Sequence, residues 1–552
     1  MTSNFSIHSA TAFKQSFRDQ SIYLYVGRPE SWTDDEAPPA LEDTLNNMRG
    51  VWDNMVGLNR IDYGKVRQGI ERVNWESGGV YEKYDHANTN LGTGNGFYVL
   101  AGTTDRDVYK CLDNNDFLPS SVKPSHKNLN LSEEVDGYVW KYMYTIKDAD
   151  FSQFATSGIL PIGSQPGVSL SAEDGSVTKV TIAANSTSGT GRYYRGSRYS
   201  NSSASAISNG TIFTEVTGST PVTSLVLAAD DGLLSSDDYF NNSAFQVTSG
   251  RSAGTIRTIT DWVNSTNTVT LDTGLINVSN GDTFIIGPKV TLTGDDSGSG
   301  FLGIGEVNSY GNLVNIIVGS SGSGYTNSNI AVSIETNYAS GVAGVGAVAN
   351  VYISPMGGHG KSIQSELNAK YVIVSAETTV ANINDEESGT SIGPQNQIRQ
   401  VGLIRSPEIQ TQIVSSPSYD LRTNFYLPHP TPTMGSTYGI KQDALLTNAN
   451  TGGVARVWSI AGTAGKQYIT VMNVRGSFTD GDWVYAGNQY VQLSSANLAY
   501  HEYPSGSQYP PSEAVQSGMI TKYSGDIMYH ENISEVSRYD GQKENFKFIF
   551  EF

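Results

Sequence analysis

The chain of 552 residues is 38% hydrophobic and only 16% charged, and its 31 tyrosines, 18 phenylalanines and 7 tryptophans exclude an intrinsically disordered chain. A net charge of −19 repels phosphate backbones and anionic lipid, so we expect neither nucleic acid nor a membrane as a partner. The single cysteine, Cys111, excludes an intrachain disulfide, suits a reducing compartment and is predicted to be a small buried hydrophobe.

Residues 1–162 are predicted to form an N-terminal framework domain. Apolar residues at helical spacing predict short helices over 9–20 and 41–56. Alternating apolar residues predict a strand over 22–26, which a Gly-Arg-Pro sequence ends, and a second strand over 136–146. On that second strand, one face carries Tyr138, Trp140, Tyr142 and Tyr144. The first twenty residues lack the apolar core of a signal peptide and no apolar run reaches the length of a membrane span, so we expect a protein made in a cytoplasm that stays soluble.

The composition changes near residue 163. Residues 163–354 are mostly Ser, Thr, Gly and Asn with short Val/Ile runs, which predicts inserted β modules, and 433–500 are predicted to form a second inserted module. Segments 254–284 and 453–484 resemble each other, because in each two strands are followed by a Gly-Asp pair and a third strand. Chance similarity between low-complexity strands is the competing explanation. A Ser/Gly-rich turn ending at Tyr325 is a candidate sugar-binding tip, although most such turns are plain loops.

The framework resumes in residues 355–432 and again in 501–552. Here we predict a short helix over 362–369 and strands that begin at Tyr371 and Gln400. The last residues alternate strictly, so one face of a final strand carries Phe546, Phe548, Phe550 and Phe552. The whole sequence predicts a mainly β, multi-domain protein, with an antiparallel β-sandwich or barrel-like framework, a few short helices and inserted small β modules.

Motifs of catalysis and of metal or cofactor binding are missing from the sequence. The seven histidines form no HExxH or HxH pattern, and there is no CxxC or GxSxG. The acidic pairs Asp34–Asp35 and Glu133–Glu134 sit in polar segments and are interpreted as solvated surface. We therefore predict no catalytic residue, no metal ligand and no cofactor, and do not expect an enzyme. A depolymerase would need a pair of carboxylates in a groove, which nothing in the sequence marks.

The segment PMGGHGKS, residues 355–362, follows a predicted strand and precedes a predicted helix, which is the setting of a phosphate-binding loop. However, Pro355 occupies the place of the first glycine of that motif. Proline lacks an N–H and fixes φ, which impairs a cradle made of backbone amides. A glycine-rich turn leading into a helix is the favoured interpretation, and nucleotide binding that depends on Lys361 is the alternative.

Several sequence blocks follow one another along the framework, and the most specific are DGYVWKY from Asp136 and SGDIMYHEN from Ser524. The positions that mark the blocks are Gly27, Arg28, Trp32, Trp52, Arg72, Trp75, Tyr109, Cys111, Gly137, Tyr138, Trp140, Arg399, Gln400, Gly525, Tyr529, Glu531 and Asn532. In this order they resemble the baseplate wedge protein that T-even-type contractile phages encode as their eighth gene. The resemblance covers about half of the chain. The T-even-type protein is much shorter, and the excess here lies in the two insertions.

The resemblance implies a mostly antiparallel β protein with sandwich-like domains and without catalytic residues. It implies a homodimer in each wedge of a six-fold tail baseplate, in contact with other wedge proteins, assembled in the host cytoplasm and retained in the virion. The expected function is a structural one that includes the baseplate rearrangement on infection. The alternative is a host-surface or carbohydrate-binding adhesin or fibre protein, since exposed loops of the inserted β modules are suited to binding.

Overall fold

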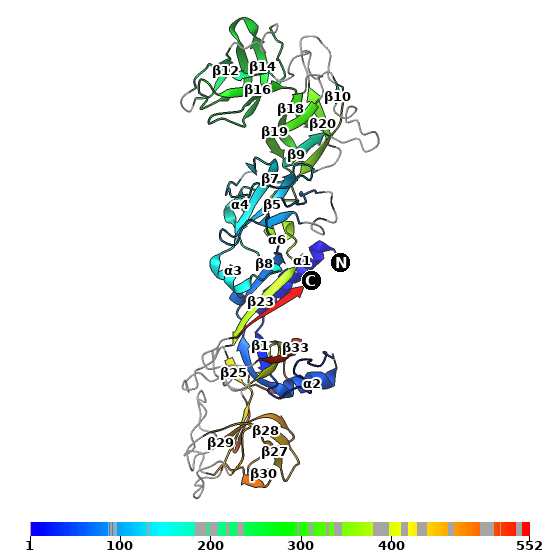
Figure 1. The fold of residues 1–552 in the computed structure, drawn as a ribbon, viewed down its shortest axis with the longest axis vertical. Coiled ribbons are helices and arrows are strands. Elements are labelled where there is room, and N and C mark those ends of the chain that lie inside the picture. The colour runs from blue at the N-terminus through cyan, green and yellow to red at the C-terminus, as the bar shows by residue number, and fades with distance from the viewer. Residues whose placement is uncertain are drawn as a thin grey trace. The chain divides into compact units, whose positions relative to one another are not determined.

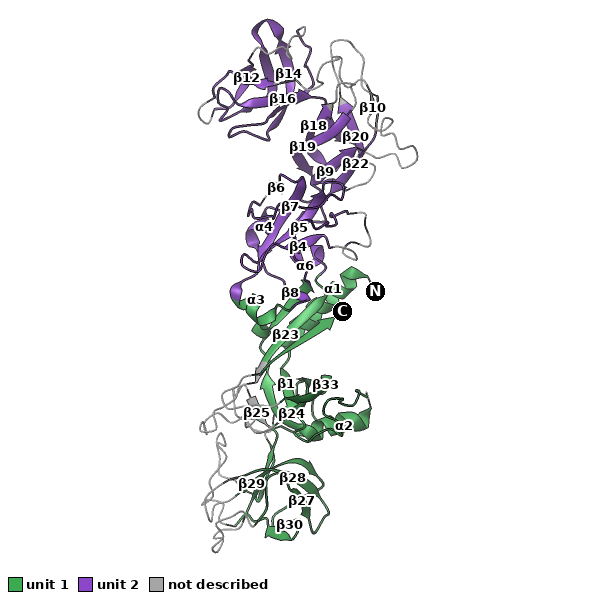
Figure 2. Cartoon of the chain, viewed as in Figure 1, with its two compact units in different colours: residues 1–70, 149–156, 369–552 green, residues 71–148, 157–368 purple. Residues whose placement is uncertain are grey.

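The computed structural model describes two compact units, which are coloured separately in Figure 2. Unit 1 comprises residues 1–70, 149–156 and 369–552, and unit 2 comprises 71–148 and 157–368. Several antiparallel sheets and a few short helices make the protein mainly β, which confirms the predicted fold class. The description covers all residues except 1, 43, 87, 89–90, 92–95, 130–131, 183–195, 198–207, 217–219, 229–236, 295–296, 308–312, 327–329, 336–344, 379–396, 410–417, 428–438, 462–467, 497–512, 519 and 537–543.

Two helices were predicted near the N-terminus, and both are present with different bounds (Figure 1). Helix α1 (Ser3–Asp19) begins before the predicted residue 9. Helix α2 (Leu45–Asn54) begins later than predicted because Thr44 caps it, with its hydroxyl accepting a hydrogen bond from the Asn47 amide at 3.2 Å. It ends where strand β2 begins. Two further short helices are η1 (Tyr63–Lys65) and α3 (Asp148–Phe154).

Unit 1 contains two framework sheets. The five-stranded sheet has the order β25 (Ser418–Asp420), β2 (Met55–Arg60), β1 (Ile22–Gly27), β24 (Ile398–Arg405) and β33 (Asp526–Val536). The other sheet contains β34 (Glu544–Glu551), β23 (Tyr371–Thr378) and β3 (Val66–Glu71). Side chains from both sheets and from α1 share one buried hydrophobic cluster that includes Phe17, Leu24, Val372, Leu403 and Phe548. The sheets therefore pack against each other as a sandwich.

The final strand is β34, and it pairs antiparallel with β23 along its whole length, from Tyr371 opposite Glu551 to Thr378 opposite Glu544. Phe548 is 7% exposed, whereas Ile549 on the opposite face is 41% exposed. The predicted alternation of the final strand is therefore confirmed, and its phenylalanine face is the one that contributes to the core.

The framework sheet of unit 2 has the order β4 (Tyr98–Leu100), β5 (Asp107–Asn114), β7 (Tyr138–Thr145) and β6 (Ser132–Glu133). On β7, Tyr138, Trp140 and Tyr142 share one aromatic core, whereas Tyr144 is buried outside it because the pairing with β5 shifts register between Tyr142 and Tyr144. The prediction of one face with four aromatic residues is therefore wrong for Tyr144. Lys141 and Met143 on the other face are buried as well, so both faces of the central strand are covered. Helix α4 (Pro166–Leu170) contributes Val168 to the aromatic core, and β8 (Ile159–Pro161) precedes it along the chain.

The rest of unit 2 contains smaller sheets. Strand β9 (Val177–Ile182) pairs with β22 (Ala349–Ile353), and β10 (Gly196–Ser197) pairs with β21 (Val345–Ala347). A four-stranded sheet has the order β19 (Leu313–Ser323), β18 (Ser299–Val307), β17 (Lys289–Thr293) and β20 (Ala331–Glu335). The prediction of a Ser/Gly-rich turn before Tyr325 is wrong, because Ser320 to Ser323 extend β19 and pair with β18. The partner strand supplies the backbone hydrogen bonds that a turn would otherwise need.

The two segments with similar sequences belong to sheets, here called the first and second repeat modules, in which five strands share one order and connectivity while the edge strands differ. The first has the order β11 (Ser208–Thr211), β16 (Thr283–Gly287), β13 (Ala244–Val247), β14 (Ile256–Val263), β15 (Thr268–Leu275) and β12 (Val222–Val226). The second has the order β31 (Gln489–Gln492), β30 (Trp483–Ala486), β27 (Leu445–Asn448), β28 (Val454–Ala461), β29 (Tyr468–Arg475), β26 (Thr423–Tyr426) and β32 (Val515–Gln516). Strand by strand, the first module's β12, β13, β14, β15 and β16 correspond to β26, β27, β28, β29 and β30 of the second, and each set pairs in the same pattern.

The two modules also share a turn. The Gly-Asp pairs at 281–282 and 481–482 precede the last equivalent strand, and the glycine φ angles are 95° and 86°. Each aspartate is buried and accepts a hydrogen bond from the amide three residues before it, from Ser279 at 2.8 Å and from Thr479 at 2.7 Å. The shared connectivity and turn favour related modules over a chance likeness of low-complexity strands.

Candidate functional site

Arg399 is the centre of a buried ion-pair cluster in unit 1. Its side chain is 1% exposed on the inner strand β24. The Nε and Nη2 atoms each donate to a different oxygen of Asp35, both at 2.7 Å, and Nη2 also donates to Glu535 Oε2 at 3.0 Å. Nη1 donates to the carbonyl of Pro29 at 2.7 Å. The hydrogen bond from Arg399 lowers the pKa of Asp35, because it favours the ionised carboxylate.

Other positions that mark the sequence blocks, here called the block positions or matched positions, extend this cluster along the same strands. The Gln400 amide donates to Asn532 Oδ1 at 2.8 Å, and Asn532 Nδ2 donates to the carbonyl of Pro39 at 3.0 Å. The indole N–H of Trp32 donates to the carbonyl of Ile533 at 3.1 Å. The loop after β1 is thus held against β24 and β33 by side chains from both ends of the sequence.

The Gly-Arg sequence that ends β1 has a steric explanation. A Cβ on Gly27 would lie 2.3 Å from the carbonyl oxygen of Asn54, so only glycine allows this approach. Arg28 follows with a φ of 51°, and its guanidinium carbon lies 3.7 Å from the centre of the Trp32 ring. Trp52 on α2 is buried in a neighbouring hydrophobic cluster. These matched residues shape and support the sheet.

The last matched block lies on β33 and the turn before it. Gly525 has a φ of 73°, and a Cβ there would lie 2.6 Å from the carbonyl oxygen of Arg405. The Tyr529 hydroxyl donates to Glu531 at 2.7 Å, and its ring meets the ring of Phe548 edge-on. Burial raises the pKa of Tyr529 to about 12. This block therefore connects the two framework sheets.

In unit 2 the matched positions gather in one aromatic core. Trp75 packs against this core and donates its indole N–H to Ser120 at 3.1 Å, while Arg72 donates to Asn74 at 3.0 Å. Gly137 has a φ of 79° and leaves room for Asn115. The prediction that Cys111 is a buried hydrophobe is confirmed, and burial raises the pKa of its thiol. The fully buried members of the core include Tyr109, Cys111, Tyr138 and Trp140.

A second polar cluster lies inside unit 2 around Lys110, whose side chain is fully buried on β5. Its Nζ lies 2.8 Å from Glu366 Oε2 and 3.0 Å from His359 Nδ1, and 3.8 Å from the centre of the Tyr84 ring. The other ring nitrogen of His359 lies 2.8 Å from the hydroxyl of Thr178. Burial lowers the pKa of both Lys110 and His359, and it lowers that of His359 well below the usual range. A neutral His359 can accept from Lys110 and donate to Thr178, so the cluster is satisfied internally.

This cluster explains the glycine-rich loop at 355–362. The amide of Gly360 donates to both carboxylate oxygens of Glu366, at 2.8 and 3.0 Å, and the amide of Ser362 donates to one of them at 3.3 Å. The loop does hold an anion, but the anion is the chain's own buried glutamate. Ser362 then caps helix α6 (Ile363–Glu366), which is shorter than the predicted helix over 362–369. The interpretation as a glycine-rich turn leading into a helix is confirmed.

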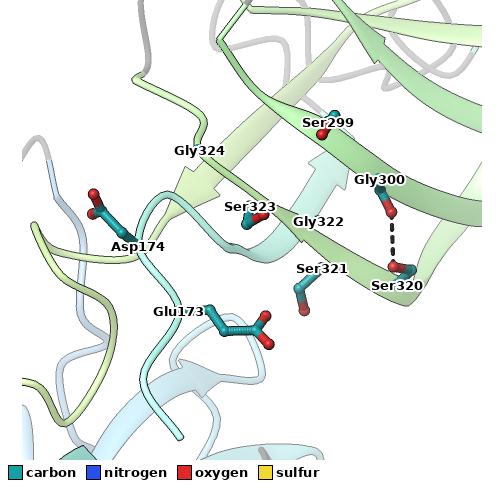
Figure 3. Close-up of a pocket in the computed structure, with 9 residues that line it drawn as sticks. All are labelled: Glu173, Asp174, Ser299, Gly300, Ser320, Ser321, Gly322, Ser323 and Gly324. Atoms are coloured by element: carbon teal, nitrogen blue, oxygen red, sulfur yellow. Dashed lines mark hydrogen bonds between the residues drawn. The ribbon is translucent and has the colours of Figure 1, made fainter. Parts of the chain in front are cut away.

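An open depression of about 700 Å³ lies beside the Ser/Gly-rich end of β19 (Figure 3). Hydrogen bonds to backbone carbonyls hold its lining in place, since the Gly324 amide donates to Asp174 at 2.8 Å and the Ser320 hydroxyl donates to Gly300 at 2.7 Å. The Asp174 carboxylate accepts from the Gly357 amide at 2.7 Å. The candidate sugar-binding tip therefore has no aromatic face among its lining residues, because Tyr325 is buried behind them.

Among the residues that the structure describes, no group of three or more His, Cys, Asp or Glu side chains is placed to hold a metal ion. No described helix is long and apolar enough to cross a lipid bilayer. Of the pair Asp34–Asp35, Asp34 is exposed, and Asp35 is 27% exposed and pairs with Arg399. At the other acidic pair, Glu133 is exposed, while the Glu134 amide donates to the carbonyl of Tyr138 at 2.8 Å.

No protein-family model matches the sequence, and no curated protein matches it at a significant level.

Sequence reasoning missed the roles of Asp35, Lys110 and Glu366. Lys110 lies between Tyr109 and Cys111 on a strand, so its position suggests a solvent-facing side chain unless both faces of the sheet are known to be covered. Glu366 follows the glycine-rich loop by a few residues, and this spacing was the one available signal for a carboxylate that fills the loop.

Proposed function

We propose that this protein is a structural component of the baseplate wedge of a contractile phage tail, where it forms a homodimer, contacts other wedge proteins and takes part in the rearrangement on infection. The observation that carries the proposal is the convergence of the matched blocks. Trp32 and Ile533 are 501 residues apart in the sequence and are joined by a hydrogen bond within the Arg399 cluster. The blocks of unit 1, which resemble one family in order, meet in the sheet of β1, β24 and β33 and support a common framework.

The surface of unit 2 offers a site for a protein neighbour. Phe117, Leu118 and Val135 are 64%, 54% and 98% exposed. Their two loops lie at the same end of β5 and β7, because Asn115 donates to the carbonyl of Asp136 at 3.0 Å. Exposed apolar residues of this kind mark protein contacts, and the acidic residues nearby, Asp116 and Glu133, suit a basic partner surface.

The decisive experiment is quantitative mass spectrometry of particles of the phage that encodes the chain. About twelve copies per particle, two for each wedge of a six-fold plate, are expected. Light scattering of the pure protein is expected to give a dimer that persists at micromolar concentration. Absence of the chain from the particle overturns the proposal, and a trimer of the pure protein in place of the dimer favours a fibre.

A pair of variants separates assembly from folding. Val135→Asp is expected to keep the melting temperature of the wild type but to reduce incorporation into particles, because it adds a charge to the proposed contact surface. Met356→Asp is the matched control, since Met356 is also 95% exposed in unit 2. Equal incorporation of both variants removes this surface from the proposal.

A further inference from the structure

The second repeat module carries three aromatic side chains on one face of a hairpin, here called the aromatic platform: Trp483, Tyr485 and Tyr490. Strands β30 and β31 pair with Trp483 opposite Gln492 and Tyr485 opposite Tyr490, so these four residues share the face opposite to buried Val484. Trp483 and Tyr490 are 46% and 56% exposed. The rings of Tyr485 and Tyr490 lie 5.2 Å apart and are tilted by 30°.

The first repeat module shows that this scaffold does not require aromatic residues there. In that module β13 and β16 pair with Val247 opposite Phe284, as Asn448 lies opposite Val484 in the second. Thr283 therefore occupies the position of Trp483, directly after the shared Gly-Asp turn. By the same register, Ile285 is the equivalent of Tyr485. Asn209 lies opposite Ile285, as Tyr490 lies opposite Tyr485, although β11 reaches this edge from the other end of the module sequence.

The first module has the same turn and strand with Thr283 at this position, so neither feature requires an exposed indole. Leaving aromatic surface in water is unfavourable, and a continuous run of it marks a binding site. The three rings on adjacent strands of the second module thus have a role other than folding.

The geometry points to a carbohydrate as the ligand of the aromatic platform, and we propose that this face of the second module binds a glycan chain. The C–H face of a sugar ring is slightly positive and stacks on the negative face of an aromatic ring. Residues two apart on a strand are about 7 Å apart and neighbouring strands about 5 Å, so the rings span one or two sugar units. Gln492 and the half-buried Thr447, which lies opposite Tyr485 on β27, supply polar groups at the edge of the platform.

The same face is small for a protein partner. A stable protein contact covers about 800 Å² on each side, whereas the platform is one hairpin wide. Further along this face, Trp458 and Met472 are already covered by Val56 of the framework. The inference is independent of the proposed wedge function, because the platform lies outside the matched blocks.

The test uses the full-length protein on a printed array of defined oligosaccharides, followed by calorimetric titration with the best-bound one. Trp483→Thr and Tyr490→Asn replace each residue with the one at the matching position of the first module, so the fold should be kept. Each is expected to weaken binding by about tenfold or more, whereas Trp483→Phe retains most of it. The matched control is Phe213→Thr, which removes a 61% exposed aromatic residue from the first module and should leave binding unchanged.

Binding by the wild type that is lost in Trp483→Thr at an unchanged melting temperature supports the inference. No bound oligosaccharide on the array overturns it, as does equal binding by wild type and Trp483→Thr. If Trp483→Thr instead loses a virion protein that co-purifies with the wild type, while no glycan binds, the platform is a protein contact and the inference is wrong.

Discussion

Arg399 and Asp35 form a two-pronged ion pair in which Nε and Nη2 each lie 2.7 Å from a different carboxylate oxygen. The planar guanidinium matches the carboxylate, so both hydrogen bonds form without strain. Since Arg399 is on β24 and Asp35 is in the loop after β1, the pair fixes that loop on the sheet.

Replacing Arg399 with alanine is expected to lower the free energy of unfolding by about 3 kcal/mol, because Asp35 and Glu535 would face each other without a cation and the Pro29 carbonyl would lose its donor. Arg405→Ala on the same strand is the control. Arg405 is 39% exposed and its partner Asp526 is 68% exposed, so its loss should cost less than about 1 kcal/mol. Urea unfolding measures both, and equal losses would contradict the prediction.

The same pair predicts a dependence of stability on pH. The folded-state pKa of Asp35 is lowered, so its contribution is fully present above the unfolded value of about 3.9 and is lost as pH falls through the folded pKa. Wild type should therefore be more stable than Asp35→Asn at pH 7, and the difference should shrink below about pH 4. In an Arg399→Met background the Asp35→Asn substitution should show a much smaller pH-dependent difference. A gap that stays constant down to pH 2.5 in the wild-type background would refute this account.

Glu366→Ala is expected to cost about 3 to 5 kcal/mol of stability, since it leaves Lys110 buried without its counter-ion and removes the acceptor of the Gly360 amide. Lys361→Ala, five residues away on the exposed side of the loop, should change stability by less than about 0.5 kcal/mol. Thermal unfolding gives both values. A large effect of Lys361→Ala together with nucleotide binding by the wild type would revive the phosphate-loop alternative.

Phe548→Asp is expected to destabilise the protein by several kcal/mol, roughly 3 or more, because it places a charge between the two framework sheets. The neighbouring Ile549→Asp faces the other way, where Ile549 is 41% exposed, and should cost about 1 kcal/mol or less. Comparing the two melting temperatures isolates burial from the loss of strand propensity. Similar melting temperatures of the two variants would mean that the phenylalanine face of β34 is not part of the buried core.

Patterns of period two predicted the framework strands well, because strands at 22–26 and 136–146 need only alternation and aromatic content to be recognised. The bounds of α2 were missed because a cap at Thr44 and a strand beginning at Met55 decide them, and both depend on neighbours in space. The Ser/Gly-rich end of β19 was predicted as a turn for the same reason. Its composition favours turns, and the pairing with β18 overrides that preference.

Burial of single residues could be predicted from the sequence, whereas the partners within the polar clusters could not. Cys111 was correctly expected in a core, since cysteine is usually buried. Asp35 and Arg399 are separated by 364 residues, and no local pattern reports a pairing over such a distance. The module similarity was visible as a repeated Gly-Asp pair, but only the strand order distinguishes a shared fold from chance.

The shared turn of the two repeat modules leads to the last prediction. Asp482 accepts hydrogen bonds from the amide and hydroxyl of Thr479, at 2.7 and 3.1 Å, and from Asn448 at 2.7 Å, and these hydrogen bonds lower its pKa against the opposing effect of burial. Asp482→Ala should therefore cost about 2 to 3 kcal/mol.

Asp282 accepts from the Ser279 amide at 2.8 Å within the same turn, so Asp282→Ala should also destabilise its module, by about 1 to 2 kcal/mol. Hydrogen exchange of the full-length protein can assign each loss to its module, since each substitution should lower protection around its own turn and leave the other turn unchanged. If only one aspartate matters, the two turns are alike in shape but not in their contribution to folding, and the case for two related modules would rest on strand order alone.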